Sequence, residues 1–340
     1  METGEPPQST DDAERADRHH ALSKRLAAMD DTALQALLGE VTRGFGGDTT
    51  TVTVDGTPVF VKLVPLTDLE RRPENLGSTA NLFHLPLFYQ YGIGSAGFGA
   101  WRELAVHTMT TAWALDGGYA GFPLVHHWRV LPRTPNPMDA ADLDRWVKHW
   151  DDDAAVRARL TAIGGASAAI ALFMEHFPLT LDVWLAGQGE QAYDAVDRAL
   201  AEGAAFLRSQ GLIHFDAHFR NLLTDGQRIY FADFGLAVHT GFDLDAAEQD
   251  FHRRHLDYDR SYTAAHLARW LIHRLLDVPW PEVLGRLRAY PSDPGLPPAA
   301  DRIVRRHLPT ALITGGFFEQ LWNDKSTPYP AEELRRLRSR

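Results

Sequence analysis

The sequence of 340 residues contains no cysteine. This absence excludes disulfide bonds, thiolate catalysis and zinc–thiolate sites, and it is typical of a cytoplasmic protein. No apolar run approaches the ~20 residues that a membrane-spanning helix needs, and the acidic first residues are not those of a signal peptide. With 34 Lys and Arg against 45 Asp and Glu, the net charge is −11, whereas a nucleic-acid-binding surface needs clustered basic residues. We therefore expect a cytoplasmic protein that binds neither a nucleic acid nor a membrane.

The remaining composition is that of a globular protein, with 44% hydrophobic and 23% charged residues. Residues 1–18 are polar and acidic, which predicts a disordered tail. The apolar spacing over residues 19–38 predicts helices, with a break near Asp30 and Asp31 where a second helix is capped. The basic residues 335–340 predict a solvated helix end. The folded part of the chain is expected to begin after the tail.

A stretch over residues 199–237 carries the polar residues that say most about function. A helical apolar pattern ends at Gly211. Asp216, Asn221 and Asp233 follow in loops around a predicted hairpin. Asp216 and Asn221 are five positions apart, and Asp233 follows Asp216 by 17 positions. Because the hairpin folds the chain back on itself, we expect the three side chains to lie close together.

These residue types suit phosphoryl transfer. An incoming hydroxyl must be aimed at the γ-phosphate of a nucleotide and must lose its proton, which a carboxylate such as Asp216 can accept. The charge of a triphosphate is neutralised by Mg²⁺, whose preferred ligands are oxygens such as those of Asp233 and Asn221. The sequence therefore predicts that Asp216 is the catalytic base and that Asn221 and Asp233 hold the metal.

The same stretch resembles the protein-kinase-like superfamily, whose catalytic loop reads H-R-D-x-x-x-x-N and whose metal loop reads D-F-G. Here the two motifs are His214-Phe215-Asp216 with Asn221, and Asp233-Phe234-Gly235. The resemblance implies ATP and Mg²⁺ as cofactors and an α+β, bilobal fold. In such a fold, residues 39–177 form a lobe with a small antiparallel β-sheet. Residues 178–340 then form a mainly helical lobe that carries both loops.

Candidate phosphate-binding residues lie in the first lobe. The chain after residue 39 is typical of antiparallel strands, with an Asp55-Gly56 turn before a strand that carries Lys62. The resemblance implies that Lys62 grips the phosphates and that a glycine-rich lid precedes its strand. Small residues in such a lid let backbone N–H groups approach phosphate oxygens. The candidate lid residues are Gly44, Gly46, Gly47 and Thr49. Their spacing departs from G-x-G-x-x-G, since Thr49 stands where the third glycine would fall.

Two insertions interrupt the first lobe. Residues 65–99 are rich in aromatic residues and glycine, too apolar for a disordered linker and too glycine-rich for one long helix. They predict an ordered segment packed beside the phosphate site. Residues 132–165 predict a polar helical segment. Both insertions are therefore expected to be folded.

A helix is predicted over residues 101–115, after the first insertion. The resemblance implies a carboxylate that pairs with Lys62 and holds it on the phosphates. Glu103, in the first turn of this helix, is the best candidate for that carboxylate. Glu70 and Glu74 are alternatives, since they also lie between the lysine strand and the helix.

A strand is predicted over residues 168–175, where the two lobes would meet. Its position resembles the hinge of kinases, whose backbone groups bind adenine. The corresponding groups here are those of Glu175 to Phe177. Main-chain binding makes few demands on side chains, so this prediction depends on position alone.

The chain after Gly235 departs from typical protein kinases. No A-P-E segment ends an activation loop, and residues 236–250 carry one hydroxyl side chain, Thr240. Phe215 stands where many kinases have the arginine that binds a loop phosphate. We therefore expect activity that is constitutive or set by substrate binding. Further helices are predicted over residues 255–276, 279–290 and 300–321.

The motifs favour two kinds of acceptor. The metal loop at Asp233 is similar to that of protein kinases. His218, two positions after Asp216, is similar to the H-x-D-x-H-x-x-N loop of aminoglycoside phosphotransferases, where it contacts phosphate or fills the loop. We favour a Ser or Thr hydroxyl of a protein or peptide, such as a biosynthetic precursor peptide; the alternative is a hydroxyl of a small metabolite or antibiotic. An acidic groove would suit a cationic aminoglycoside, and a long, partly apolar groove a peptide.

A binding scaffold of the pseudokinase type is a different class of function. A scaffold has no chemical need of the set Lys62, Asp216, Asn221 and Asp233, so the sequence favours an enzyme. A nucleotidyl transferase would use the same residues to bind an inverted nucleotide.

Overall fold

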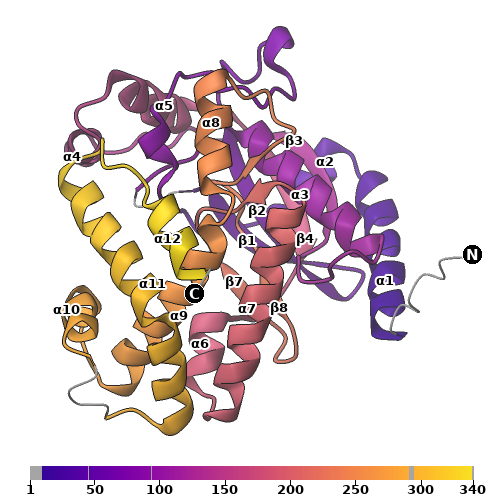
Figure 1. Cartoon of the computed structure of the whole chain (residues 1–340). Coiled ribbons are helices and arrows are strands. Elements are labelled where there is room, and N and C mark those ends of the chain that lie inside the picture. Colours follow the sequence, from indigo (N-terminus) through magenta and orange to yellow (C-terminus); the bar gives the residue numbers. More distant parts are fainter. Residues whose placement is uncertain (1–9, 45, 93, 291–294, 339–340) are drawn as a thin grey trace, which may run out of the picture.

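The computed structural model describes residues 10–44, 46–92, 94–290 and 295–338. The architecture is mixed α+β: an antiparallel sheet of four strands forms the N-terminal part, and the rest of the described chain is mostly helical (Figure 1). None of the helices in these ranges combines the length and the apolar character that a membrane crossing requires.

The four-stranded sheet has the order β1-β2-β4-β3 and is antiparallel throughout. Its strands are β1 (Asp48–Val54), β2 (Thr57–Leu66), β3 (Val125–Pro132) and β4 (Ala168–Glu175). β4 is central and buried along most of its length, which explains its unbroken apolar run. The strands agree with the predicted series, except that residues 40–43 contribute only an isolated bridge between Thr42 and Thr49.

The β1–β2 hairpin fixes the position of Lys62. Asp55 and Gly56 have φ angles of 48° and 80°, which suit the two-residue turn predicted there. The register places Lys62 opposite Thr49 of β1 and opposite Leu172 of β4. Lys62 therefore lies inside the sheet, and its side chain is almost fully buried.

Helices pack on both faces of the sheet. They are α1 (Thr10–Ala27), α2 (Asp31–Leu38) and α3 (Ala100–Leu115). Leu26 of α1 and Leu34 of α2 pack with Val59 and Val61 of β2, whereas α3 packs on the alternate side chains of that strand. The predicted cap of the second helix is confirmed, because Asp30 accepts a hydrogen bond from a backbone N–H in its first turn.

The first helix begins earlier than predicted. The sequence predicts a disordered tail over residues 1–18, but the second half of this segment belongs to α1, while residues 1–9 lie outside the described ranges. Acidic residues in the first turn complement the helix dipole. Arg15 forms an ion pair of 2.5 Å with Glu175 at the end of β4. This tertiary contact, which leaves no local pattern in the sequence, orders a segment of disordered composition.

Both predicted insertions are ordered, and they pack on each other. The first contains the 3-10 helices η1 (Pro73–Asn75) and η2 (Leu87–Gln90), and the second contains α4 (Ala140–His149) and α5 (Ala154–Gly165). The rings of Phe88 and Tyr89 lie against Trp150, with centroids 5.9 and 4.9 Å apart. The aromatic residues of the first insertion thus form a small core with the second.

The C-terminal part contains short strands and eight further helices among its described residues. The strands are β5 (Leu179–Thr180), β6 (Leu212–Ile213), β7 (Leu222–Thr224), β8 (Ile229–Phe231) and β9 (Val238–His239). The helices are α6 (Leu181–Ala186), α7 (Gln191–Ser209), α8 (Ala246–His255), α9 (Tyr258–Leu275), η3 (Trp280–Glu282), α10 (Val283–Arg288), α11 (Pro298–Asn323) and α12 (Ala331–Arg338).

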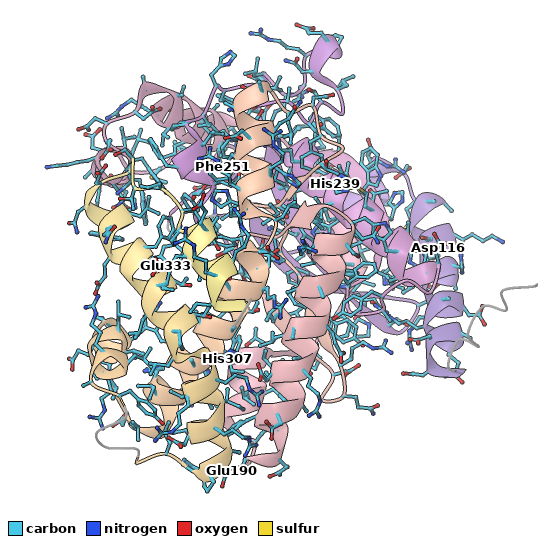
Figure 2. The ribbon with its side chains drawn as sticks, in the orientation of Figure 1. Asp116, Glu190, His239, Phe251, His307 and Glu333 are labelled. Atoms are coloured by element: carbon cyan, nitrogen blue, oxygen red, sulfur yellow. The ribbon has the colours of Figure 1, made fainter. Side chains whose placement is uncertain are left out.

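The long helices α7, α9 and α11 surround the main core (Figure 1). Polar contacts also join them: His307 of α11, labelled in Figure 2, is 2.7 Å from a carboxylate oxygen of Asp197 on α7. The predicted helix over residues 255–276 is α9, but α8 before it was not predicted. α8 is too polar to show an apolar period, although Asp245 and Glu248 form a capping box that marks its start.

Candidate active site

Two loops of the C-terminal part carry the predicted catalytic and metal residues. β7 and β8 form the predicted hairpin, and the backbone N–H of Ala232 donates to the carbonyl of Asn221 at 3.0 Å. This contact brings Asn221 next to Asp233. The Nδ2 group of Asn221 donates to the backbone carbonyl and to the carboxylate of Asp216, both at 3.0 Å. The three side chains meet, as the spacing predicts.

A buried carboxylate on α9 anchors the loop of Asp216. Asp259 accepts hydrogen bonds from the backbone N–H groups of His214 at 2.7 Å and Phe215 at 3.0 Å. Phe215 has a φ of 65°, which is unfavourable for a bulky side chain. Its buried ring packs on Tyr258, with 4.7 Å between ring centroids. Asp259 thus holds a strained backbone in place, and nothing in its local sequence marks this role.

Lys62 reaches the same place from the sheet. Because side chains alternate along a strand, Lys62 shares a face of β2 with Val64 and Leu66, and this face packs on α3. The Nζ atom of Lys62 is 2.7 Å from Glu103 Oε1 and 2.7 Å from Asp233 Oδ1. Glu103 is therefore the partner of Lys62, as predicted, and Lys62 joins the two parts of the molecule.

The two alternative partners of Lys62 lie elsewhere. Glu70 is buried and forms an ion pair of 3.0 Å with Arg159 of α5. It also accepts a hydrogen bond of 2.7 Å from the backbone N–H of Ala100 at the start of α3. Glu74 is exposed on η1. Glu70 therefore ties both insertions to α3 and has no direct contact with the lysine.

Burial opposes every charge in this cluster, and the partners compensate to different extents. Asp233 and Glu103 outweigh burial at Lys62 and raise its pKa. Lys62 outweighs burial at Asp233 and lowers its pKa to about 2. At Glu103 the effect of burial is larger than that of Lys62, so the pKa of Glu103 is raised. The side chain of Asp233 is 45% exposed and that of Glu103 only 4%. Asp233 is thus the carboxylate that a ligand can reach.

Asp216 holds its proton to a higher pH than an ordinary carboxyl group does. Burial and the charge of Asp233 raise the pKa of Asp216 to about 8, against the opposing hydrogen bond from Asn221. His218 Nε2 lies 3.7 Å from Asp216 Oδ1, and burial lowers the pKa of this imidazole. His218 is therefore neutral at pH 7 and does not neutralise Asp216. A carboxylate that exchanges protons near neutral pH is suited to proton transfer.

These groups line a cleft of about 210 Å³, in which Lys62, Glu103, Asp216, Asn221 and Asp233 are brought together. Arg159 lines it too, so that three carboxyl groups and two cationic side chains face the cleft. The cleft is too small for an entire nucleotide. Its dimensions suit the metal and phosphate end of such a ligand.

The first insertion covers one side of this cleft. Gly97 has a φ of 72°, and a Cβ atom there would lie 2.2 Å from the carbonyl oxygen of Gly235, so glycine is required. Gln90 donates a hydrogen bond to the backbone carbonyl of Leu236. The insertion therefore lies beside the site, as predicted, in direct contact with the loop after Asp233.

The predicted glycine-rich lid is only partly at the cleft. Gly46 lines it, near Lys62. A Cβ atom on Gly47 would come within 2.7 Å of the carbonyl oxygen of Leu63, and one on Gly44 within 2.6 Å of the carbonyl oxygen of Gly47. These two glycines are required by close backbone packing. The other predicted lid residue is Thr49, which pairs with Lys62 across the β1–β2 ladder. Residue 45 lies outside the described ranges.

Two of the predicted hinge residues, Glu175 and Phe177, make contacts within the protein, whereas the backbone groups of His176 and Phe177 remain a prediction. The carboxylate of Glu175 binds Arg15, and its backbone N–H donates to the carbonyl of Leu124 at 2.9 Å. The ring of Phe177 lies against Tyr230, with 4.0 Å between centroids. The N–H of Glu175 is therefore not available to adenine. Arg15, which the sequence assigned to a tail, is the residue that organises this end of β4.

The residues at the cleft fit a magnesium ion. Mg²⁺ commonly takes one or two protein oxygens and completes its shell with phosphates and water. Lys62 contacts Oδ1 of Asp233, so Oδ2 of this carboxylate is left for a metal ion. Asn221 uses its Nδ2 group in hydrogen bonds, so its Oδ1 atom is also left. In the described ranges no three His, Asp or Glu side chains gather as a metal site. The cleft therefore offers an ion two protein oxygens, which is the number that Mg²⁺ commonly takes from a protein.

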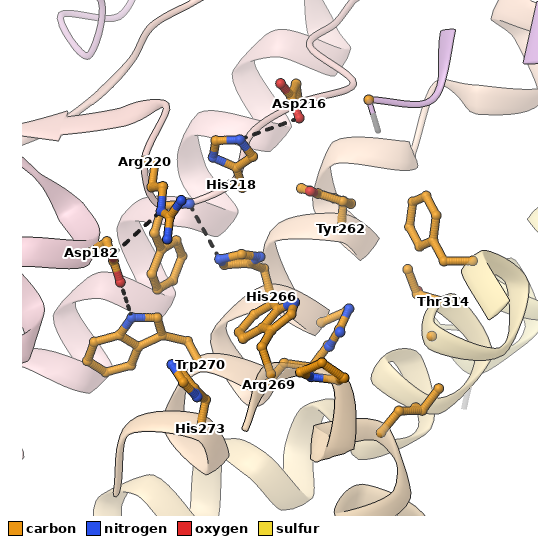
Figure 3. A pocket seen from close by; sticks show the side chains of 18 of the residues that line it. Asp182, Asp216, His218, Arg220, Tyr262, His266, Arg269, Trp270, His273 and Thr314 are labelled. Carbon is orange, nitrogen blue, oxygen red and sulfur yellow. Dashed lines mark hydrogen bonds and ion pairs between the residues drawn. The ribbon is translucent and has the colours of Figure 1, made fainter. Parts of the chain in front are cut away.

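A second cavity, of about 850 Å³, adjoins the cleft at Asp216 (Figure 3). Gly92, Asp216 and His218 line both. Helices α9 and α11 and the segment around Trp280 enclose the rest of the larger cavity. Asp216 thus lies on the boundary between two cavities, a position that the sequence did not predict.

Comparison with protein-family models finds no family that matches this chain, and no curated protein matches it either.

Proposed function

We propose that the protein is an ATP- and Mg²⁺-dependent phosphotransferase with a kinase-like, bilobal fold, and that it transfers the γ-phosphate to a hydroxyl group. One observation carries the proposal: Lys62 lies 2.7 Å from both Glu103 and Asp233, in a cleft that also contains Asp216 and Asn221. A cation, a metal-binding carboxylate and a base are the groups that this reaction requires.

Asp233 and Asn221 are the residues that would hold Mg²⁺, and the bound ion would neutralise charge on the triphosphate. Lys62 binds phosphate oxygens, and Glu103 keeps the lysine in that position. Asp233 is already ionised in the absence of metal, because its pKa of about 2 is far below neutral pH. The carboxylate is thus ready to bind a cation.

Asp216 orients the acceptor hydroxyl and takes its proton. The hydroxyl oxygen bonds to the γ-phosphorus while the bond from that phosphorus to the β–γ bridging oxygen breaks, and ADP leaves. The hydrogen bonds from Asn221 fix the Asp216 carboxylate. The backbone bonds to Asp259 fix its loop. This positioning supplies much of the catalysis in phosphoryl transfer.

The acceptor is either a peptide or a small molecule. The sequence favours a Ser or Thr hydroxyl of a peptide. The cavity of about 850 Å³ beyond Asp216 favours the small molecule, because its volume falls within the range of small-ligand sites. A non-catalytic scaffold is disfavoured because it has no chemical need of Lys62, Glu103, Asp216 and Asp233 together in one cleft.

Transfer can be tested with γ-labelled ATP, Mg²⁺ and a cell lysate split into peptide and small-molecule fractions. The proposal predicts label in one of the two fractions, and Asp216→Asn should abolish it. If the protein binds ATP but label enters neither fraction, the result supports a binding scaffold and contradicts a phosphotransferase.

A further inference from the structure

The large cavity differs in chemistry from the cleft that it adjoins. Its walls are rich in aromatic side chains, including Tyr262, Trp280, Phe318 and Trp322. Trp322 is 55% exposed, although large apolar side chains are normally covered. Aromatic walls of this kind bind flat, apolar ligands.

Positive charge faces the same cavity. Arg269 and Arg274 of α9 line it. The guanidinium of Arg269 lies 4.5 Å from the ring centroid of Trp280. Within the described part of the chain, no carboxylate forms an ion pair with Arg269, although Glu319 is near enough for its charge to act on the pKa of the guanidinium against the effect of burial. The buried Nε atom of Arg269 has no hydrogen-bond partner there. A guanidinium with unused donors is a binding group for an acid.

The acidic side chains of the cavity are already engaged. Asp182 lies 3.9 Å from Arg220 and accepts a hydrogen bond from an indole N–H at 2.8 Å (Figure 3). Glu319 forms an ion pair of 2.5 Å with Arg288. The remaining acid is Asp216, at the boundary with the cleft. The far end of the cavity is therefore positive, although the whole chain has a net charge of −11.

The wall opposite α9 also has an unsatisfied polar group. Thr314 of α11 is 4% exposed, and its hydroxyl has no hydrogen-bond partner among the described residues. Buried polar groups are rarely left unpaired. The hydroxyl of Tyr258, which lines the same cavity, is likewise without a partner. Both lie directly at the cavity wall, where a ligand with several oxygen atoms would satisfy them.

We infer that the acceptor of the proposed phosphotransfer is a small acid: a flat, apolar molecule with an anionic group that binds Arg269 and a hydroxyl that reaches Asp216. Tyr262 and Arg269 are two turns apart on α9, so the two ends of the ligand are separated by about 11 Å. A cationic aminoglycoside does not fit, because its ammonium groups would face Arg269. This inference rests on the proposed function for the transfer step, but its binding step is independent.

Three probes of nearly the same shape but different charge show whether affinity depends on charge or on shape. They are 6-(hydroxymethyl)-2-naphthoate, its neutral carboxamide and its cationic aminomethyl analogue. Calorimetry with the full chain and no nucleotide measures binding, and label from γ-labelled ATP measures transfer. We expect the anion to bind at least about tenfold more tightly than the carboxamide, a difference of about 1.4 kcal/mol, and the cation to bind most weakly. Transfer should follow the same order.

Arg269→Gln should bring the anion and the carboxamide to equal affinity without changing that of the carboxamide. Arg269→Lys, which keeps the charge, should restore part of the preference. Arg253→Gln is the control, because Arg253 is exposed and pairs with Asp250 on α8. Thermal unfolding of each variant shows whether it folds.

Equal binding of the three probes, or no binding of any, would overturn the inference. An anion preference that survives in Arg269→Gln would overturn the role of Arg269. The naphthoate could bind selectively while no label is transferred to it or to either lysate fraction. That result would support an acid-binding cavity and contradict the proposed phosphotransferase activity. The two proposals can therefore fail separately.

Discussion

The two cavities that meet at Asp216 are lined by different kinds of side chain. The smaller, of about 210 Å³, gathers the carboxylates of Glu103, Asp216 and Asp233 around one lysine. The larger, of about 850 Å³, has aromatic walls and the unpaired Arg269. A cleft with excess carboxylate attracts a cation, and a cavity with excess guanidinium attracts an acid. Asp216 thus lies between two cavities that are lined by different chemical groups.

This difference separates recognition from reaction. In the proposed function, the groups that would hold the metal and the phosphates lie on one side of Asp216, and the groups that would select the acceptor lie on the other. The separation predicts that substitutions in one cavity leave binding in the other intact. The following experiments test it, from the largest expected effect to the smallest.

Asp233→Asn should have the largest effect. It removes the ionised oxygen that would bind Mg²⁺ and leaves Lys62 with Glu103 alone. We expect phosphotransfer to fall to background and Mg²⁺-dependent ATP binding to be lost. Calorimetry with ATP in the presence and absence of Mg²⁺ measures the second effect. Binding of the naphthoate probe should be unchanged, and its loss would contradict the separation of the two cavities.

Asp216→Asn should stop phosphoryl transfer and leave the binding of ATP and of the naphthoate probe intact. Removal of a general base lowers kcat by about 10²- to 10⁴-fold. ATP and the naphthoate should still bind, because neither the metal oxygens nor Arg269 is altered. Rapid-quench measurement of a single turnover gives the rate of the chemical step. Turnover equal to that of the wild type would exclude Asp216 as the base.

Trp280→Ala should weaken the binding of the acceptor and leave the binding of ATP unchanged. It removes an aromatic wall and the ring that supports Arg269, at a cost of roughly 1 kcal/mol, about fivefold in affinity. ATP affinity should not change. Trp128→Ala is the matched control, because Trp128 is 43% exposed on β3 and lines neither cavity. A similar loss in both variants would show that the effect is not local.

The pH dependence should show the state of Asp216. Its pKa is raised to about 8, so below that pH the base is partly protonated. We expect kcat/KM for MgATP to rise about tenfold per pH unit up to pH 8 and then to level off. A profile that is flat between pH 6 and 9 would contradict this assignment.

The same shift makes the stability of the folded protein depend on pH. In the unfolded chain Asp216 ionises near pH 4, and in the folded chain near pH 8. Between these values only the folded state holds the proton, so the stability contribution of this group falls as the pH rises. Asp216→Asn should therefore unfold at a higher temperature than the wild type at pH 8, with little difference near pH 4. Thermal unfolding at both values measures it.

Much of the small cleft follows from local sequence. A two-residue turn aligns the strand of Lys62, and a second hairpin brings Asn221 to Asp233. Both depend on turn residues and on strand alternation, which short segments encode. The α+β architecture and the pairing of Lys62 with Glu103 were predicted from the resemblance of the motifs and not from these local patterns.

Contacts between distant segments were not predictable. Asp259 holds the loop of Asp216 from α9, and Arg15 binds the end of β4 from the first helix. The hinge prediction at Glu175 did not foresee that its side chain and N–H are engaged within the protein. The larger cavity forms where helices far apart in the chain pack. Such contacts depend on the tertiary arrangement, so no short sequence pattern predicts them.

Arg15 also sets a practical limit on how the protein can be shortened. Its guanidinium donates to the carbonyls of Ala120 and Phe122 as well as to Glu175. A recombinant version that begins at His19 would retain the residues of both cavities and lose these hydrogen bonds, which leaves the buried carbonyl of Phe122 and the partly buried carbonyl of Ala120 without this donor. Expression boundaries should therefore be placed upstream of the first helix.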